Sequence, residues 1–282
     1  MTELAMLEPP TSWPGRYPWG PKRVAIGLGI ALGVFVLTNV VLVVIVIVGG
    51  FGTNSEDVGD TFVKMVEVAS YADERLRMAA EGTKLAKPPE LLADIGTLRL
   101  GLASTFIYDV LLIVIAVSVA KVTLRDAARL LKLDGYEWGG IWRPCLAVFV
   151  SYIAIAIYAL AAQATGIGFL EPNSTLPSAV LRDDLALAAA GILAVLCAPI
   201  AEEAFFRGFV FGGLTKWGFW PAALLSGLLF AGVHFDPGSV VPFLGIGVVL
   251  SWLFWVRGSL WDSIIFHVLF NGTSFAILLA TR

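Results

Sequence analysis

Two adjacent carboxylates and an arginine lie inside an apolar stretch of the chain. Glu202 and Glu203 are followed by Arg207 within a run, residues 185–214, that is otherwise largely hydrophobic. On insertion scales, each charged side chain near the middle of a membrane-spanning helix costs about 2.5–3.5 kcal/mol. Such a group is therefore expected to be paired, functional or both. An ion pair that only holds helices together is the alternative interpretation.

The spacing of these residues predicts different roles for the two glutamates. Residues four apart share one face of an α-helix, so Glu203 and Arg207 are predicted to form an ion pair. Glu202 is rotated by about 100° from Glu203 and is less well placed to contact the arginine. One glutamate is thus predicted to be held while the other is free for chemistry. Pro199 is predicted to kink this helix or to begin a new segment.

Both histidines of the chain fall in predicted spans. His234 lies near the end of one apolar segment, and His267 shares a helical face with Asn271, four residues later, in another. A single buried histidine is more often structural than catalytic. Here both histidines lie in the same part of the chain as the two carboxylates and the asparagine, which favours one polar site over unrelated contacts.

The chemistry that these side chains suit is hydrolysis. A carboxylate in an apolar setting can act as a general base on water. Histidine can position that water, transfer the proton or bind a metal, and Asn or neutral His can donate hydrogen bonds to a developing oxyanion. The candidate catalytic residues are Glu202, His234, His267 and Asn271. If a metal is used, its candidate ligands are Glu202, His234 and His267, and zinc is the candidate ion.

Other hydrolytic sites fit the sequence less well. The chain contains neither His-Glu-x-x-His nor Gly-x-Ser-x-Gly. Tyr108-Asp109 matches half of the motif pair of intramembrane aspartyl proteases, but the partner motif Gly-x-Gly-Asp is absent. Asp109 is therefore predicted to be a structural polar contact that can also support the site.

The composition predicts an integral membrane protein. The chain is 58% hydrophobic and 15% charged, against about 25% charged residues in ordinary soluble domains. The net charge of −3, without a dense basic patch, predicts no nucleic-acid partner. Cys145 and Cys197 lie far apart in apolar segments and are predicted to be packing residues.

The apolar segments predict an all-α, polytopic bundle of about seven transmembrane helices. The first segment is too long for the core of a signal peptide and is expected to remain as an anchor. Amphipathic helices are predicted over residues 58–78, within a long polar section, and over residues 124–133. The predicted spans are residues 24–48, 101–120, 145–166, 185–214, 219–235, 240–256 and 260–279.

The distribution of Lys and Arg predicts the orientation of the chain in the bilayer. These residues concentrate in the N-terminal tail and in the connections after the second, fourth and sixth spans. The third connection has only Arg182 and the fifth has none. The N-terminus is therefore predicted to lie inside and the C-terminus outside.

Three motifs together resemble the signature of a known family. They are Glu-Glu-x-x-x-Arg at residues 202–207, Phe-x-x-x-His at Phe230 and His234, and His-x-x-x-Asn at residues 267–271. Their order, spacing and placement on successive helices resemble the CPBP family of intramembrane proteases, which includes CAAX-prenyl-protease-type and bacteriocin-processing (Abi) members. The resemblance implies a C-terminal catalytic core, residues 181–282, preceded by a tail, three spans and polar loops in residues 1–180.

The resemblance also implies roles for the candidate residues. Glu202 would activate water together with His234, His267 and Asn271 would form the oxyanion hole, and the Glu203–Arg207 pair would orient the site. The implied activity is that of an endopeptidase acting on membrane-associated or lipidated proteins or peptides, in the bacterial cytoplasmic membrane. The resemblance leaves open a glutamate mechanism or a metalloprotease.

Two other classes of function are alternatives to a protease. The first is a non-catalytic membrane scaffold or bacteriocin self-immunity protein that keeps the motifs as a structural network. Against it, every signature position is present. The second is a proton-coupled transporter in which Glu202 and the histidines relay protons. Against it, the sequence shows no paired repeats of the kind that transporters often contain.

Overall fold

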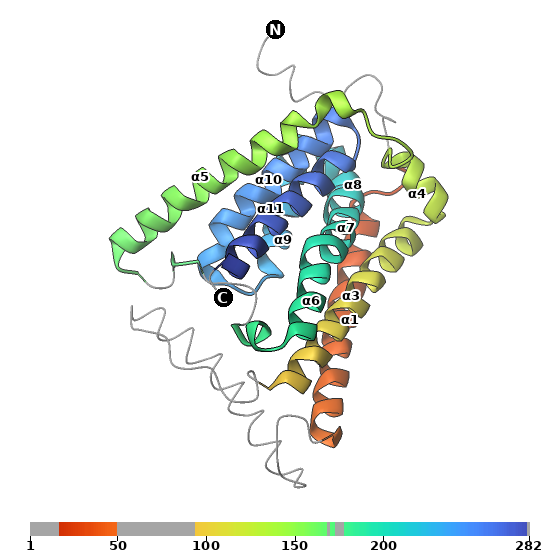
Figure 1. Ribbon diagram of the computed structural model, residues 1–282. Coiled ribbons are helices and arrows are strands. Elements are labelled where there is room, and N and C mark those ends of the chain that lie inside the picture. The colour runs from red at the N-terminus through yellow and green to blue at the C-terminus, as the bar shows by residue number, and fades with distance from the viewer. Residues whose placement is uncertain (1–16, 50–93, 168–169, 173–177, 281–282) are drawn as a thin grey trace.

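The described part of the protein is a bundle of helices without β-strands. The computed structural model describes residues 17–49, 94–167, 170–172 and 178–280 (Figure 1). Within them, six helical segments are long and apolar enough to cross a membrane, and one further apolar helix is shorter. This agrees with the predicted bundle of about seven spans. The main helices are α1 (Pro21–Gly49), α3 (Ile95–Ala120), α4 (Leu124–Leu130), α5 (Trp142–Thr165), α6 (Asp184–Ile192), α7 (Ala198–Glu202), α8 (Gly212–Leu214), α9 (Phe219–Gly232), α10 (Val240–Arg257) and α11 (Trp261–Ala280).

Most predicted spans agree with the observed helices, and the fifth is the main difference. It was predicted over residues 219–235, but α9 ends at Gly232 and a turn follows. Phe235 in that turn has a φ of 52°, a value that no right-handed helix allows. The helix predicted over residues 124–133 is confirmed as the shorter α4. The helix predicted over residues 58–78 lies outside the described residues.

The central helical element runs from α6 to α8 and alternates between two helix types. Two π-helical stretches, η6 (Leu193–Cys197) and η7 (Glu203–Phe211), flank the short α7. Pro199 lies in the first turn of α7, and the backbone continues through it as a helix. Of the two alternatives predicted at Pro199, a kink or the start of a new segment, the second agrees with the structure, because the π-helical η6 ends at Cys197 and α7 begins at Ala198 with Pro199 in its first turn. Such π-helical turns occur frequently at functional sites.

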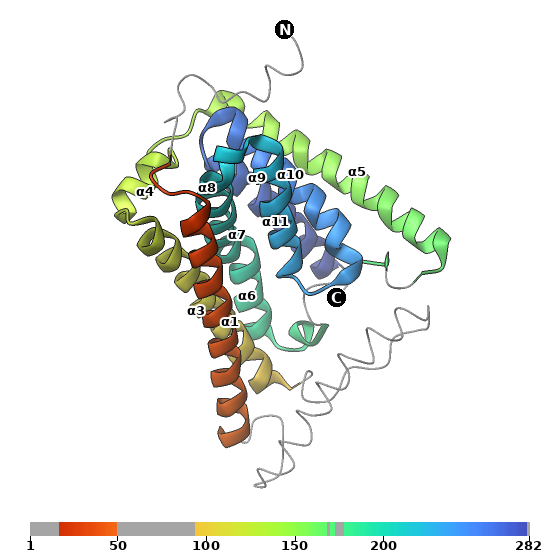
Figure 2. The same cartoon turned by 180° about the vertical axis from the view of Figure 1, so that it is seen from behind.

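Two groups of helices pack on this central element (Figures 1 and 2). Helices α1 and α3 lie along one side of it, and α9, α10, α11 and α5 lie on the other. The helices α9 and α10 cross very closely, since a Cβ atom on Gly247 would lie 2.5 Å from the Cα atom of Gly227. The same Cβ atom would lie 3.4 Å from a guanidinium nitrogen of Arg207. The crossing therefore places α10 directly against the arginine of the central element.

Hydrogen bonds join the connections at one end of the bundle. The α4–α5 connection accepts from three groups at the start of α11: the Leu260 amide donates to Leu131 O (2.9 Å), the Ser259 hydroxyl to Lys132 O (3.1 Å) and the Trp261 indole to Leu133 O (3.2 Å). The Arg23 guanidinium donates to Ala120 O at the end of α3 (2.8 Å). These bonds join the start of α11 to the α4–α5 connection and the start of α1 to the end of α3.

A charged pair joins two helices at the opposite end. Arg99 of α3 donates two hydrogen bonds, of 3.2 and 2.7 Å, to the carboxylate of Asp183. Asp183 is the N-cap of α6 and also accepts from the Ala186 amide (2.7 Å). The hydrogen bonds from Arg99, and then that from Ala186, lower the pKa of Asp183 below its ordinary value. The pair fixes the start of the central element relative to α3.

Candidate active site

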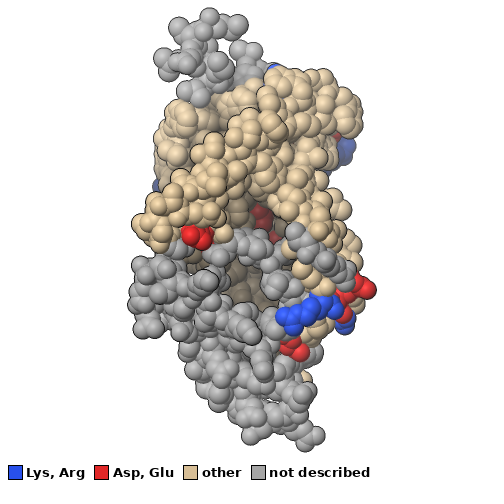
Figure 3. All heavy atoms as spheres, turned by 60° about the vertical axis from the view of Figure 1, so that its left-hand side comes forward, with Lys and Arg blue, Asp and Glu red and all other residues tan. Residues whose placement is uncertain are grey.

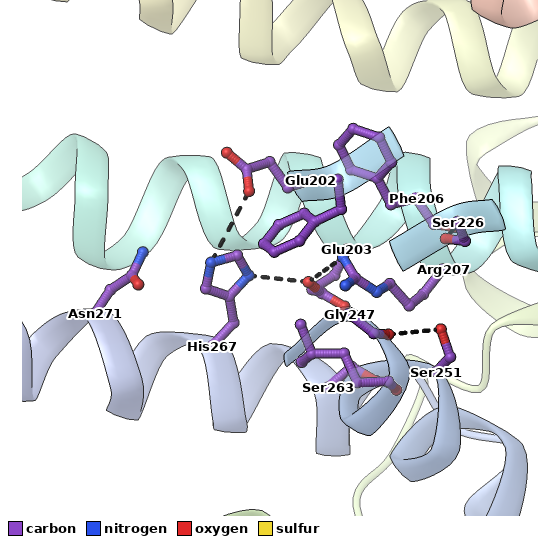
Figure 4. Close-up of polar contacts among 12 residues, drawn as sticks. Glu202, Glu203, Phe206, Arg207, Ser226, Gly247, Ser251, Ser263, His267 and Asn271 are labelled. Atoms are coloured by element: carbon purple, nitrogen blue, oxygen red, sulfur yellow. Dashed lines mark hydrogen bonds and ion pairs between the residues drawn. The ribbon is translucent and has the colours of Figure 1, made fainter. Parts of the chain in front are cut away.

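A fully buried ion pair lies at the centre of the bundle. Glu203 and Arg207 have no solvent-exposed surface, and Arg207 Nη1 lies 3.0 Å from Glu203 Oε1 (Figure 4). The predicted pairing is confirmed. The guanidinium carbon also lies 4.3 Å from the centre of the Phe230 ring on α9, an arrangement that stabilises a cation further. Each charge of the pair is thus neutralised where water cannot reach it.

His267 of α11 lies between the two glutamates. Its Nδ1 atom is 2.9 Å from Glu203 Oε1, the oxygen that also accepts from Arg207. Its Nε2 atom is 3.9 Å from Glu202 Oε2 (Figure 4). A carboxylate paired with an arginine can only accept, so Nδ1 is assigned as the donor. The Nε2 atom, on the side of Glu202, is left for contact with reacting groups.

Glu202 differs from Glu203 in both burial and pairing. Its side chain is 19% exposed, whereas that of Glu203 is 0% exposed. Within the described residues, Glu202 Oε2 has no hydrogen-bond partner. The charge of Asp109, a residue of α3 that is 5% exposed, interacts with that of Glu202. Glu203 Oε2 likewise has no hydrogen-bond partner there, so the two glutamates differ in exposure and in pairing with Arg207. The glutamate predicted to be free for chemistry is the one that is partly exposed and not paired with the arginine.

His234 lies in the turn after α9, on the other side of an aromatic ring from His267. Its Nδ1 atom lies 2.7 Å from the carbonyl oxygen of Phe230. The centre of the Phe230 ring is 4.9 Å from that of His234 and 5.7 Å from that of His267. In the part of the chain that the structure describes, no hydrogen bond or ion pair joins His234 to Glu202. The two histidines therefore share Phe230 as a neighbour.

Asn271 lies one helical turn beyond His267 on α11. Its side-chain amide donates to the carbonyl oxygen of Ala194 in η6 (2.8 Å). The structure thus brings Glu202, Glu203, Arg207 and His267 together directly. Asn271 and His234 flank this group on one side.

Sequence reasoning missed several residues that position the site. Tyr152 of α5 donates to the carbonyl oxygen of Phe270 (2.8 Å), and its ring stacks on that of Phe270 at 4.7 Å between ring centres. The hydroxyl also lies 2.7 Å from that of Ser274. These contacts hold α11, and with it His267, against α5. A polar tyrosine within an apolar span is the only sequence signal for this role, and it does not indicate a partner.

The described residues contain no site that suits a metal ion. No group of three or more His, Cys, Asp or Glu side chains in them is arranged to hold one. The proposed ligands Glu202, His234 and His267 do not form such a group, and Glu203 already contacts Nδ1 of His267. The donor set that zinc would need is thus not assembled by these side chains.

The fold and the site define a polytopic helical membrane protein with a buried Glu–Arg–His network beside a second, more accessible glutamate. Residues 184–273 match the family described as type II CAAX prenyl endopeptidase Rce1-like. The resemblance inferred from the motifs is confirmed for this part of the chain, and the match supports a CAAX-protease-type peptidase at the level of the family. The matched segment contains Glu202, Glu203, Arg207, His234, His267 and Asn271.

A curated protein is similar to part of the chain. It is the UPF0177 protein YxdF of Lactococcus lactis subsp. lactis (strain IL1403), 31% identical over 100 residues. The similarity covers 31% of this chain and 55% of that protein, so the chain spans about half the length of its relative. No solved structure matches the chain.

Proposed function

We propose that the protein is an intramembrane endopeptidase in which Glu202 activates a water molecule for attack on a peptide bond. The observation that carries this proposal is the contrast between two neighbouring glutamates. Glu203 is fully buried, and one of its oxygens lies within hydrogen-bond distance of both Arg207 and His267, while Glu202 is 19% exposed and makes no ion pair with the arginine in the described residues. Only the second is available to take a proton from water.

In the proposed reaction, Glu202 removes a proton from water as the oxygen attacks the carbonyl carbon of the substrate. The resulting oxyanion needs hydrogen-bond donors that are already in position. His267 presents Nε2 on the side of Glu202, and because Nδ1 already donates to Glu203, Nε2 serves as an oxyanion donor when the ring carries a proton on both nitrogens. The Asn271 amide has a second N–H beyond the one given to Ala194. The proton held by Glu202 passes to the leaving amine when the C–N bond breaks. The family resemblance assigns His234 to the same water.

The Glu203–Arg207 pair has a positioning role in this proposal. Its carboxylate fixes the ring of His267 through Nδ1, and Arg207 in turn neutralises that carboxylate. A general base and an oxyanion donor are effective only when they are held close to the productive geometry. We therefore infer that the pair supports catalysis without contacting the substrate.

The family described for residues 184–273 suggests the substrate class, a membrane-associated or lipidated protein or peptide. In the proposed division of the chain, residues 181–282 form the catalytic core. Residues 1–180 support it, because α3 contributes Asp109 beside Glu202 and α5 contributes Tyr152 against α11. The bacterial cytoplasmic membrane is the proposed location.

The test is cleavage of a library of quenched fluorescent peptides by detergent-purified protein, with and without phenanthroline. Cleavage that the chelator does not affect is the expected result. Cleavage that the chelator abolishes would instead indicate a metalloprotease. Absence of cleavage throughout would favour the scaffold or immunity function, and uptake driven by a pH gradient would favour a transporter.

A further inference from the structure

Asp109 is a buried acid near the middle of α3, in the part of the chain that precedes the family match at residues 184–273. It is 5% exposed, and within the described residues its Oδ2 atom has no hydrogen-bond partner. An ionisable side chain at this depth of a span is costly and marks a functional site in many membrane proteins. Buried polar atoms are usually hydrogen-bonded. Asp109 is therefore expected to bind a group that the described side chains do not supply.

The helix that carries Asp109 packs on the part of the central element that carries Glu202. Helix α3 contacts both α7, which ends at Glu202, and η7. The charge of Asp109 interacts with that of Glu202. In Figure 4 the Glu202 carboxylate points away from α11, on the side of the central element along which α3 lies in Figures 1 and 2. Asp109 Oδ2 and Glu202 Oε2 are thus two unpaired oxygens on neighbouring helices.

Aromatic contacts connect Asp109 to the turn that carries His234. The ring of Tyr108, next to Asp109, lies edge-on to the ring of Phe35 on α1, at 5.6 Å between ring centres. Phe35 in turn stacks on Phe235, the residue after His234, at 5.5 Å. The helix that carries Asp109 is thus fixed relative to the histidine that the family resemblance assigns to the catalytic water.

Water can reach the carboxylate of Glu202. The side chain is 19% exposed, and Figure 3 shows acidic side-chain atoms inside a recess between uncharged surfaces of the bundle. Glu203 is fully buried and already contacts Arg207 and His267. A buried water molecule is typically held by two to four polar groups. Glu202 and Asp109 can supply two of them.

We propose that Asp109 is a further catalytic residue, which holds the attacking water molecule together with Glu202. One hydrogen of the water is donated to Glu202, the general base, and the other is donated to Asp109. A carboxyl group can accept a hydrogen bond whether or not it carries a proton. With both hydrogens held, a lone pair of the water oxygen is directed away from the two acids and toward the substrate. The proposal rests on the endopeptidase function proposed above and adds a residue of α3 to it.

The second hydrogen of the water stays on the attacking oxygen throughout the reaction. Glu202 takes the first proton as the O–C bond forms, and returns it to the leaving amine as the C–N bond breaks. Asp109 neither gains nor loses a proton. It accepts a hydrogen bond first from the water, then from the hydroxyl group of the tetrahedral intermediate. Loss of Asp109 is thus expected to slow the chemical step and to leave peptide binding nearly unchanged.

The first experiment compares two substitutions of Asp109 in detergent-purified protein. Asp109→Leu removes the acceptor and is expected to lower kcat at least about tenfold with KM within about threefold of wild type, because a misplaced reactant can cost about 100-fold. Asp109→Asn keeps an acceptor oxygen and is expected to have at least about threefold higher kcat than Asp109→Leu. Wild-type kcat in Asp109→Leu, or equal losses in the two variants, would overturn the proposal.

Thermal unfolding separates this role from a structural one. Asp109→Leu removes a buried carboxyl group that has an unpaired oxygen, so its melting temperature is expected to equal or exceed that of wild type. Thr105→Leu is the matched control and should keep wild-type kcat, since Thr105 lies one turn earlier on α3, is exposed and donates to Gly101 O. A lower melting temperature in Asp109→Leu together with a raised KM would indicate a structural role and overturn the proposal.

A double variant tests whether Asp109 and Glu202 act on the same water. Adding Asp109→Leu to Glu202→Gln is expected to lower kcat/KM by less than about threefold further, because groups that act as a unit have non-additive effects. Losses that multiply would show independent roles and overturn the proposal. If Glu202→Gln loses cleavage and Asp109→Leu does not, only the role of Asp109 is wrong. Absence of cleavage by the wild-type protein would overturn the endopeptidase function, and the role of Asp109 with it.

Discussion

The side-chain amide of Asn271 donates to the main-chain carbonyl of Ala194, and this carbonyl lacks a donor from its own helix. In η6 the Ala198 amide donates to Leu193 O, in the π-helical register, and so does not serve Ala194. The next residue that could donate in that register is Pro199, which has no N–H group. The asparagine thus supplies the hydrogen bond that the π-helical turn and the proline together remove. Asn271, a residue of the His-x-x-x-Asn motif, therefore also contributes to the structure.

Replacement of Asn271 by Leu is expected to destabilise the protein by about 1–3 kcal/mol, because it leaves the part-buried carbonyl of Ala194 without a donor. Thermal unfolding in detergent measures the effect. Asn39→Leu is the matched control. Asn39 also donates to a helix carbonyl, Phe35 O (2.8 Å), but it is exposed on α1, within a regular α-helix. Equal effects of the two substitutions would contradict the role given to Asn271.

Removing only Glu203 from the Glu203–Arg207 pair is expected to reduce stability more than replacing both residues of the pair. Glu203→Leu is expected to cost about 3–5 kcal/mol of stability, because it leaves a buried arginine uncompensated, and an added Arg207→Met should restore much of it. Cleavage should stay low in the double variant because Nδ1 of His267 has lost its acceptor. Unfolding and peptide cleavage are measured in parallel.

As a control, Arg99→Met at the exposed pair with Asp183 should change stability by at most about 1 kcal/mol. A double variant no more stable than Glu203→Leu would contradict this interpretation.

The crossing of α9 and α10 predicts opposite effects for two glycines on one helix. A Cβ atom on Gly247 would lie 2.5 Å from backbone of Gly227, whereas one on Gly245 would have no atom within 4 Å. Gly247→Ala is expected to destabilise by about 1–3 kcal/mol through overpacking. Gly245→Ala is expected to be neutral or stabilising by up to about 1 kcal/mol, since alanine is the better helix former. The thermal unfolding midpoint of Gly247→Ala should therefore lie below the wild-type value. That of Gly245→Ala should equal or exceed the wild-type value. Similar losses in both variants would show that the close approach of Gly247 to Gly227 is not the source of the destabilisation.

The hydrogen bonds from Arg99 to Asp183 predict a pH-dependent contribution to stability. They hold the pKa of Asp183 below its ordinary value of 3.8. An acid with a lowered pKa in the folded state stabilises the fold above its unfolded pKa, and the contribution disappears as pH falls through the folded pKa. Asp183→Asn, which keeps a cap acceptor, should therefore melt below wild type at pH 7. The difference should shrink as pH falls below the ordinary value of 3.8 and close once pH is below the folded pKa of Asp183. A difference that stays constant as pH falls until both variants unfold would show that the ionised carboxylate is not its source.

The sequence predicted the charged pair and the spans because their signals are local. Glu203 and Arg207 lie four residues apart, and the apolar runs are long enough to identify without partners. The position of His267 between both glutamates was not predictable, since it depends on how α11 packs against the central element. The π-helical turns were also missed. In them each N–H donates to the carbonyl five residues earlier, and the pattern of apolar residues does not distinguish this from a helix kinked by proline. His234 was placed within a span, whereas it lies in the turn that follows the shorter α9.

The central claim is that Glu202 is the general base, and the most direct measurement is kcat/KM for a cleaved peptide in the Glu202→Gln variant. General bases contribute about 10²- to 10⁴-fold to rate, so a loss of at least about 100-fold is expected, with an unchanged melting temperature. Glu137→Gln is the matched control and should retain wild-type activity, since the Glu137 side chain is 88% exposed in the α4–α5 connection. Cleavage by Glu202→Gln within a few-fold of wild type would contradict the account.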